Sequence, residues 1–419
     1  MRSIPAAKGE GIHFGSRFRS LTTTPRQATV YPQPVCYNPY SMRWERGRWA
    51  SRVALAMMTC GAFVIAAALS AAVQKKKKDD ETQVLQFPKD LPGAVEGDTR
   101  RLTFYTSPLS GKGLLSQQIR DAVKALEHRA SGETILKIRA FVAGPGDVRR
   151  VRDLVSELFT DRKVALPALS LIRCGGLPLD GAQVLLEATA EGRKTTNPFG
   201  LAFISAQPAY SGDRQESVEP LIAKSADGLR RAVQAARATS SDVVRVTCFM
   251  SSLDSMTAAR TLIEGEYPHA AVSYLQTQRE PDRASVACEA VARLTADPGV
   301  PVRLVPSDPS TSDSGQSQIA LVSPAAVVLT GTQVSFGFEP KDAHLAFERL
   351  QKELEQAGTS TRSVVFAHFY PLAIPIAAQI RQVRQEFFDR TRPPAGSMLL
   401  FEGLTSLDAG FAVDVIAVK

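Results

Sequence analysis

The sequence predicts an α+β protein made of three tandem copies of one domain, each with the order β-α-β-α-β-β. The first observation is an arginine seven residues before an aromatic in three predicted helices: Arg152 and Phe159, Arg260 and Tyr267, Arg381 and Phe388. The second is a strand ending in phenylalanine before each helix and a β-branched strand with an acid after it: Phe141 and Glu187, Phe249 and Glu289, Phe369 and Asp414. A repeat of roughly 100 residues is too long for a solenoid unit, so each copy is a domain with its own strands and helices.

Copy one spans residues 99–190. We expect a strand at 102–106 and a helix at 116–127, where Ile119, Val123 and Leu126 recur at helical spacing. The remaining elements are a strand at 135–142, a helix at 148–159 and a strand pair at 169–172 and 184–190. Asp147 stands directly before the second helix and is its expected N-cap.

Copy two (residues 199–294) and copy three (residues 317–419) repeat this order. In copy two we expect strands at 202–205, 243–250, 272–276 and 285–291, a helix at 227–237 and a helix capped near Asp254. In copy three we expect strands at 327–330, 363–370, 398–402 and 411–418, and helices at 343–356 and 376–388. Residues 191–198 join the first two copies. Residues 295–316, rich in Pro, Ser and Asp, predict a flexible linker.

An uncharged segment of 21 residues, 53–73, precedes the copies. As a helix it is long enough to cross a hydrocarbon core of about 30 Å, and basic residues flank it on both sides. Two interpretations stay open: a transmembrane anchor, or a signal segment with small residues Ser70 and Ala72 at its cleavage site. Residues 1–52 are expected to be a disordered basic region, unless translation starts at Met42, and residues 74–98 a charged tether.

The charge pattern bears on location and on partners. More basic residues precede the uncharged segment than follow it, so we expect the copies outside the cytoplasm, tethered to the membrane or secreted. Residues 1–98 hold 14 Lys and Arg against 8 Asp and Glu, whereas the rest of the chain holds 36 against 34. Because the copies are nearly neutral, no nucleic-acid partner is expected.

The motifs of common enzyme classes are missing from the sequence. The five cysteines form no CxxC pattern, and we expect Cys174, Cys248 and Cys288 to be core residues of strands. The five histidines form no HExxH pattern, and no Gly-x-Ser-x-Gly occurs, so neither a metal, a cofactor nor a serine nucleophile is expected.

Several segments resemble the RidA (YjgF) family. They are residues 203–207 (FISAQ), 329–333 (LTGTQ), 166–190 (LPALSLIRCGGLPLDGAQVLLEATA) and 413–419 (VDVIAVK). The resemblance extends at the level of the copies over residues 99–419. It implies a chorismate-mutase-like α+β fold, which in this family forms homotrimers with ligand clefts between subunits. Three copies in one chain imply an intramolecular pseudo-trimer and a monomeric protein. Each sheet has helices on one face and must bury the other.

The residues that the family's enzymes use are missing. Members that hydrolyse enamines and imines hold the substrate carboxylate with a strand arginine, where this chain has Leu169, Val272 and Gly396. The family's closing-strand glutamate is replaced by Leu185, Ala287 and Ala412, and its Gly-Pro-Tyr-Ser stretch has only residues 197–200 (NPFG) as a counterpart. We therefore expect no catalytic residues. An imine hydrolase or endoribonuclease-like enzyme with an altered site is the alternative.

The copies share Arg152, Arg260 and Arg381 instead. One hypothesis is that these arginines line three clefts and bind a small carboxylate or phosphate, with Ser107 and Ser205 contributing hydroxyls. The other is that they form structural ion pairs with Glu187, Glu289 and Asp414. The sequence therefore predicts either a module that binds a small anionic metabolite or a structural module.

Overall fold

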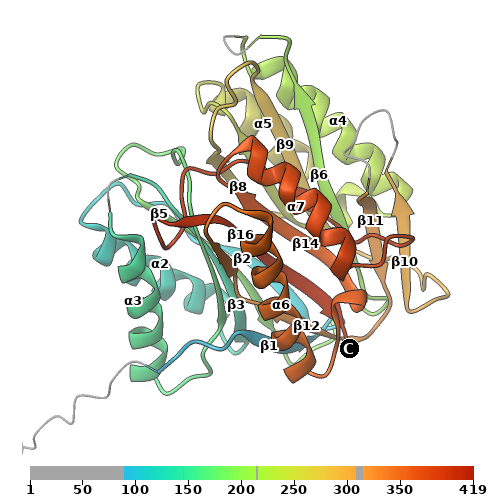
Figure 1. The fold of residues 1–419 in the computed structure, drawn as a ribbon. Helices are drawn as coiled ribbons and strands as arrows, with labels where there is room; N and C mark the ends of the chain where they lie inside the picture. The colour runs from blue at the N-terminus through green and yellow to red at the C-terminus, as the bar shows by residue number, and fades with distance from the viewer. Residues whose placement is uncertain (1–88, 145, 214–215, 308–314) are drawn as a thin grey trace, which may run out of the picture. The chain divides into compact units, whose positions relative to one another are not determined.

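The computed structural model describes residues 89–144, 146–213, 216–307 and 315–419, which belong to one unit, Val84–Lys419 (Figure 1). We refer to residues 89–191, 199–294 and 302–419 as the first, second and third stretch. The first stretch holds strands β1 Ala94–Asp98, β2 Leu102–Thr106, β3 Thr134–Val142, β4 Ala168–Arg173 and β5 Val184–Glu191, and helices α2 Leu115–Arg129 and α3 Val148–Asp161.

The second stretch holds strands β6 Leu201–Tyr210, β7 Val243–Met250, β8 Ala271–Gln276 and β9 Ser285–Arg293, and helices α4 Glu219–Ala235 and α5 Met256–Glu266. The third holds strands β10 Val302–Pro306, β11 Ser317–Val322, β12 Ala326–Thr330, β13 Gln333–Phe336, β14 Val364–Pro371, β15 Ala395–Met398 and β16 Ala409–Val418, and helices α6 Pro340–Gln356 and α7 Ile374–Phe387. The predicted α+β class is confirmed.

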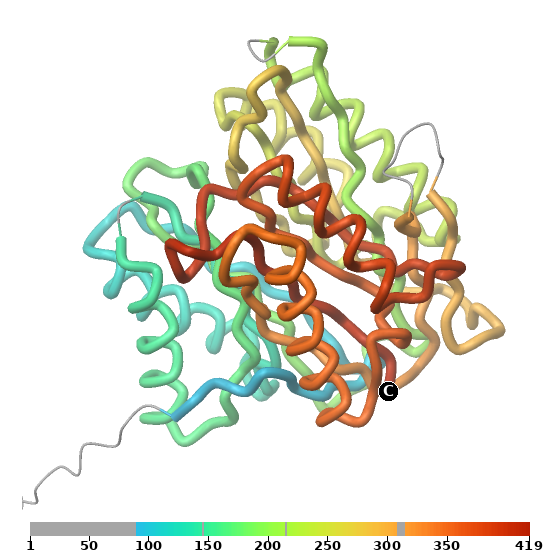
Figure 2. Tube along the Cα trace, in the orientation of Figure 1, coloured from blue at the N-terminus to red at the C-terminus, as the bar shows by residue number. Residues whose placement is uncertain are grey.

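The strands form two sheets. One has the order β2-β5-β3-β4, and the other runs β1-β12-β16-β14-β15-β11-β6-β9-β7-β8, with β10 beside β11 and β13 beside β16. In each stretch the strand before the second helix is parallel to the strand after it: β3 and β4, β7 and β8, β14 and β15. β1 leaves its own stretch and pairs antiparallel with β12 of the third (Figure 1, Figure 2).

Each pair of long helices packs its apolar face on the strands of its own stretch. The helical spacing of Ile119, Val123 and Leu126 places all three in the buried face of α2, as predicted. With residues of α3, β3 and β5 they form one core, and α4 with α5 and α6 with α7 cover two further cores of this kind. Apolar side chains at helical spacing therefore position three helix pairs over strands.

The other faces of the strands meet residues from different stretches. Phe401 of the third stretch lies with its ring centroid 6.3 Å from Phe141 of the first, 6.0 Å from Phe249 of the second and 5.2 Å from Tyr370. Successive side chains of β3, β7 and β14 thus alternate between a helix-covered core and an interior shared by the three stretches.

The repeated sequence pattern is out of step by one residue in the third stretch. The sequence pattern equated Phe369 with Phe141 and Phe249, but Phe369 lies in the helix-covered core, 6.2 Å from Phe347. Its neighbour Tyr370 takes the shared position. A shift of one residue moves a strand side chain to the opposite face.

Several predicted boundaries also change. The expected tether contains β1, and the expected linker contains β10, which pairs with β11. α4 begins at Glu219 rather than at residue 227, because Pro220 in its first turn favours an earlier start. Asp147 caps α3 as predicted, accepting a hydrogen bond from the Arg149 N–H at 3.0 Å, whereas α5 has Ser255 rather than Asp254 at its N-cap.

The strand cysteines differ from expectation in one respect. All three are buried, but Cys248 of β7 and Cys288 of β9 form a disulfide. They are directly paired residues of two antiparallel strands. Cys174 is a free, buried thiol, and burial raises its pKa to about 12.

The predicted membrane segment, residues 53–73, lies outside the described residues, as do the basic region 1–52 and most of the tether. Among the residues that the structure does describe, every helix is too short or too polar to cross a membrane.

Candidate functional site

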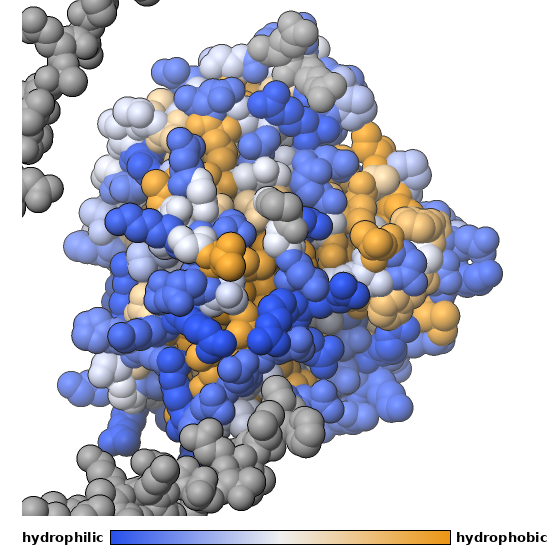
Figure 3. Space-filling view, turned by 90° about the vertical axis from the view of Figure 1, so that its left-hand side faces the viewer, coloured by the Kyte–Doolittle hydropathy of each residue, from blue (hydrophilic) through white to orange (hydrophobic). Residues whose placement is uncertain are grey.

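The three arginines singled out by the sequence lie on the helix layer. Arg152 of α3 is exposed and has its nearest acid, Asp90, at 3.8 Å. Arg260 of α5 is exposed and donates to the Pro178 carbonyl at 3.4 Å, and Arg381 is half-buried on α7. On the side where Figure 1 shows α2 and α3, hydrophilic side chains cover most of the visible surface (Figure 3). These residues sit on three separate helices.

The serines expected in the same clefts are used within the fold. The Ser107 hydroxyl accepts the Leu186 N–H at 3.0 Å. The Ser205 hydroxyl donates to the Ser317 carbonyl at 2.6 Å and accepts the Gly396 N–H at 2.8 Å. Both side chains are buried and hydrogen-bonded to backbone.

The three acids are buried, but their cationic partners come from strands. Glu187, Glu289 and Asp414 lie directly opposite Arg139, Thr247 and His368 in the strand register. Arg139 contacts Glu187 at 2.6 Å and Glu289 at 2.8 Å. The expected pairing with helix arginines is therefore replaced by pairing with groups on the strands.

Each of these acids also accepts hydrogen bonds from another stretch. The Thr247 hydroxyl donates to Glu187 at 2.7 Å, and the Ser170 hydroxyl donates to Asp414 at 2.7 Å. His368 lies between Asp414, 3.1 Å from Nδ1, and Glu289, 3.0 Å from Nε2. Lys137 of the first stretch pairs with Asp414 of the third.

The electrostatics of this buried charge cluster (Lys137, Arg139, Glu187, Arg245, Glu289, His368, Asp414) keep the acids ionised. Burial raises the pKa of Asp414, but Lys137 and His368 outweigh burial and hold that pKa well below its usual range. For Glu289, burial is likewise outweighed by His368 and Arg139, so its pKa is also lowered. Because the cluster is enclosed and its charges face one another, we interpret it as structural.

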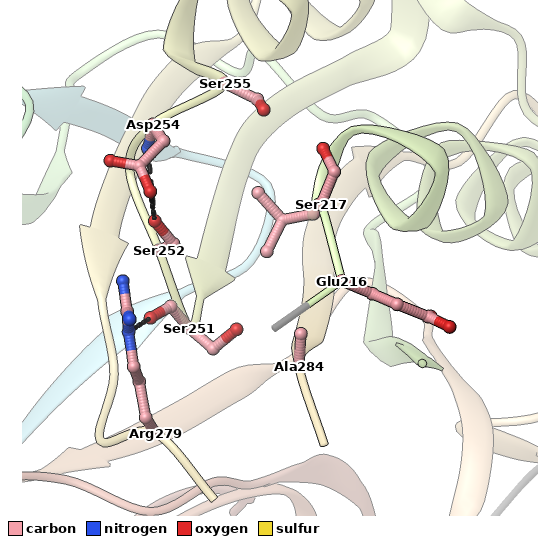
Figure 4. Close-up of a pocket in the computed structure, with 9 residues that line it drawn as sticks. Glu216, Ser217, Ser251, Ser252, Asp254, Ser255, Arg279 and Ala284 are labelled. Carbon is pink, nitrogen blue, oxygen red and sulfur yellow. Dashed lines mark hydrogen bonds between the residues drawn. The ribbon is translucent and has the colours of Figure 1, made fainter. Parts of the chain in front are cut away.

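A polar cavity of about 540 Å³ lies in the second stretch (Figure 4). Nine residues line it: Glu216, Ser217, Val218, Ser251, Ser252, Asp254, Ser255, Arg279 and Ala284. Ser251 and Ser252 directly follow β7, Arg279 follows β8, and the remaining residues precede α4, α5 or β9. The cavity therefore opens at the carboxyl ends of two parallel strands, where loops leave side chains free to meet a ligand.

Arg279 supplies the positive charge of this cavity. Its Nε donates to the Ser251 carbonyl at 2.9 Å, which fixes the guanidinium, and the side chain remains exposed. The Asp254 carboxylate accepts the Ser252 hydroxyl at 2.5 Å, and Figure 4 shows the Glu216 side chain pointing away from the serines. Glu216 is thus turned from the serines, whereas Asp254 is hydrogen-bonded to Ser252 on the same wall as Arg279.

The N-terminus of α5 adds to this positive field. α5 starts after Ser255, which does not cap its helix with a side-chain hydrogen bond. At the start of α4 the Glu219 N–H already donates to the Ser217 hydroxyl at 3.2 Å. First-turn N–H groups and the helix dipole favour anions. None of the nine lining residues is His or Cys, and no described group of His, Cys, Asp and Glu could hold a metal ion. The arrangement can bind an anion beside Arg279.

Sequence reasoning missed this site because it searched for residues that recur. Where the second stretch has Ser251, two residues after Phe249, the first has Ala143, two after Phe141. Where the second has Arg279, four residues after Leu275, the first has Gly176, four after Ile172. The available signal was the serine-rich run at residues 251–255 directly after a strand.

Comparison with known proteins gives a structural likeness. No family model and no curated protein matches the chain. A YjgF-family protein of Neisseria meningitidis is 16% identical, with 28% of this chain and 94% of that chain covered and a TM-score of 0.21. A YjgF-family member from Mycobacterium tuberculosis is 21% identical, with 28% and 99% covered and a TM-score of 0.21. For E. coli TdcF with bound serine the values are 22% identity, 22% and 80% coverage and a TM-score of 0.21.

Proposed function

We propose that this chain is a RidA-like intramolecular pseudo-trimer without the family's catalysis, and that it binds a small anion, a carboxylate or a phosphate, in the cavity of Arg279. The observation that carries the proposal is an exposed guanidinium fixed in the wall of a cavity that four serines also line. The copies would span residues 99–190, 199–294 and 317–419.

Hydrogen bonds between the stretches support the pseudo-trimer. Thr106 of the first stretch meets Ser273 of the second at 3.0 Å, with either hydroxyl as donor. The Gly396 N–H of the third donates to Ser205 of the second, and the Thr332 N–H of the third donates to the Leu169 carbonyl of the first at 3.2 Å. These contacts join the first stretch to the second, the second to the third and the third to the first, as in a closed ring of subunits.

A second ring of backbone hydrogen bonds joins the loops after β4, β8 and β15. The Gly175 N–H donates to the Gln276 carbonyl at 2.8 Å, the Gln278 N–H to the Leu400 carbonyl at 3.1 Å, and the Arg173 N–H to the Gly403 carbonyl at 2.9 Å. Each bond joins a different pair of stretches. The same cyclic pattern therefore recurs at a second level of the fold.

The surroundings of two strand positions support the absence of the family's catalysis. At these positions the family's enzymes have an arginine and this chain has none. The side chain of Leu169 belongs to a helix-covered core, and a Cβ atom added at Gly396 would lie 1.9 Å from the Ala367 carbonyl oxygen. An arginine at residue 396 would therefore require the backbone to move. No observation favours the hydrolase alternative.

We place the copies outside the cytoplasm, tethered or released according to whether residues 53–73 act as an anchor or as a signal. The Cys248–Cys288 disulfide supports this location, because disulfides form and persist in oxidising compartments.

Titration calorimetry with phosphate and with succinate tests the anion site. Arg279→Gln should weaken binding about tenfold or more, because a charge-assisted hydrogen bond contributes roughly 1.5–3 kcal/mol. Arg230→Gln is the matched control, since Arg230 is paired with Asp227 at 2.5 Å on α4 and lies outside the cavity lining. Equal binding by both variants, or no binding at millimolar ligand, contradicts the proposal.

A further inference from the structure

The cavity of Arg279 has acids in its wall as well as a cation. Glu216 and Asp254 line it together with Arg279, and all three side chains are exposed. Among the described residues none of these three forms a salt bridge, and Glu280, which follows Arg279, is paired with Arg283 at 2.7 Å instead. A cavity that exposes unpaired charges of both signs suits a ligand that carries both signs.

Arg279 and Asp254 are held by consecutive residues of one loop. The Arg279 Nε donates to the Ser251 carbonyl at 2.9 Å, and the Asp254 carboxylate accepts the Ser252 hydroxyl at 2.5 Å. Figure 4 shows both charged side chains on the same side of the cavity, with Ser217 opposite them. The cation and the acid therefore lie on one wall, and each is fixed by a hydrogen bond to the same short segment.

The remaining hydrogen-bonding capacity of these two groups is complementary. A guanidinium has five N–H donors and Nε supplies one of them, so the terminal nitrogens of Arg279 can donate to a carboxylate. A carboxylate only accepts, and the second oxygen of Asp254 can accept from an ammonium group. Because opposite charges on one wall attract the two ends of a dipolar molecule, the wall favours a zwitterion over a simple anion.

The first stretch has neither of these charges. Five residues beyond the phenylalanine of the preceding strand, the second stretch has Asp254 and the first has Gly146. Gly176 of the first stretch likewise takes the place of Arg279. The arginine and the acid thus occur together in one stretch and are missing together from the other, as expected of groups that serve one ligand.

We propose that this cavity binds a small zwitterion, with the carboxylate of the ligand on Arg279 and its ammonium group on Asp254. The inference rests on the proposed function, because the anionic end of the ligand uses the same guanidinium. Glycine, β-alanine and 4-aminobutyrate carry the two charged groups one, two and three methylene groups apart, and a cavity of about 540 Å³ admits all three.

The test compares each zwitterion with the carboxylate of the same chain length that lacks the ammonium group: acetate, propionate and butyrate. In calorimetry on the full-length protein at constant ionic strength, at least one zwitterion should bind about fivefold more tightly than its partner, the size expected of one exposed ion pair. Glycolate, which has a hydroxyl in place of the ammonium group of glycine, should bind like acetate.

Asp254→Asn keeps the shape of the side chain and an acceptor for the Ser252 hydroxyl, and it should bring each zwitterion to the affinity of its partner. Asp282→Asn is the matched control, because it removes the same charge from the exposed loop between β8 and β9, outside the cavity lining. This control should leave the preference for the zwitterion unchanged. Thermal unfolding of both variants shows that they fold.

Equal affinity for every zwitterion and its partner, with phosphate still bound through Arg279, overturns this inference and leaves the anion site in place. A preference that persists in Asp254→Asn, or that glycolate shares, overturns it as well. If neither series binds and phosphate does not bind either, the proposed function is wrong and this inference with it.

Discussion

At the scale of single residues, the acids of the buried charge cluster each take hydrogen bonds from more than one stretch of chain. Glu289 of the second stretch accepts from Arg139 of the first and contacts His368 of the third. The acid is fully buried, so removing its charge leaves Arg139 with Glu187 as its remaining acid and His368 with Asp414, and the cluster then holds one buried negative charge fewer in a dry interior. The residues that join the stretches are therefore the ones least open to change.

Glu289→Gln should lower the free energy of unfolding by about 3–5 kcal/mol at pH 7, because it breaks a buried ion pair. Urea unfolding measures this loss. Asp153→Asn on the exposed face of α3 is the matched control and should change little. A Glu289→Gln protein as stable as the native one would show that the cluster does not hold the fold.

The same acids predict how stability depends on pH. The pKa values of Glu187, Glu289 and Asp414 are lowered in the folded protein, where burial is outweighed by Arg139, Lys137 and His368. Unfolded carboxyl groups titrate near pH 4, so the stabilisation is complete above about pH 4 and is lost as the pH falls through the folded values. In Glu289→Gln this loss between about pH 4 and pH 2 should be smaller, which unfolding curves across that range can check.

At the scale of elements, the Cys248–Cys288 disulfide ties β7 to β9 next to the Arg279 cavity. Ser252 and Ala284 both line the cavity. Ser252 lies two residues after Met250, the last residue of β7, and Ala284 lies one residue before Ser285, the first residue of β9. The Ser285 N–H also donates to the Ser251 hydroxyl at 2.9 Å. The disulfide therefore holds the strand pair from which the cavity wall begins.

Reducing the native protein with a dithiol should lower its stability by about 2–4 kcal/mol, because the bond closes a loop between residues 40 apart in sequence. Thermal unfolding with and without reductant measures the effect, and the double variant Cys248→Ala with Cys288→Ala should be insensitive to it. Free thiols at both positions in protein isolated from its native location would contradict the location proposed above.

The elements also show what could be predicted from the sequence. Helix spacing and strand composition predicted the α+β class and most helices, since each helix carries its own apolar face. β1 and β10 were not predicted, because each becomes a strand by pairing with a partner, β12 and β11 respectively, that is distant or unrecognised in the sequence. The disulfide was missed because the register that pairs Cys248 with Cys288 is set by tertiary structure. Of the site, Arg279 was missed because it occurs in one stretch only, and the serine-rich run at residues 251–255 was the one signal that pointed to the cavity.

At the scale of the whole molecule, the contacts between the stretches close within one chain. The proposed pseudo-trimer therefore predicts a monomer, because the faces that a RidA-like subunit would use for trimerisation are already occupied. Light scattering coupled to size-exclusion chromatography should give the mass of one chain, about 45.2 kDa. A stable mass of three chains, independent of concentration, would contradict it.

The buried charge cluster has a consequence for how such a molecule can change by mutation. In a symmetric trimer one substitution appears three times around the axis, so an arginine there would face two copies of itself. Within a single chain, Arg139, Thr247 and His368 occupy corresponding register positions opposite three acids, and one guanidinium serves two of them. In the proposed pseudo-trimer, release from symmetry lets each copy take on a separate task, so that a polar cavity can arise in one copy alone.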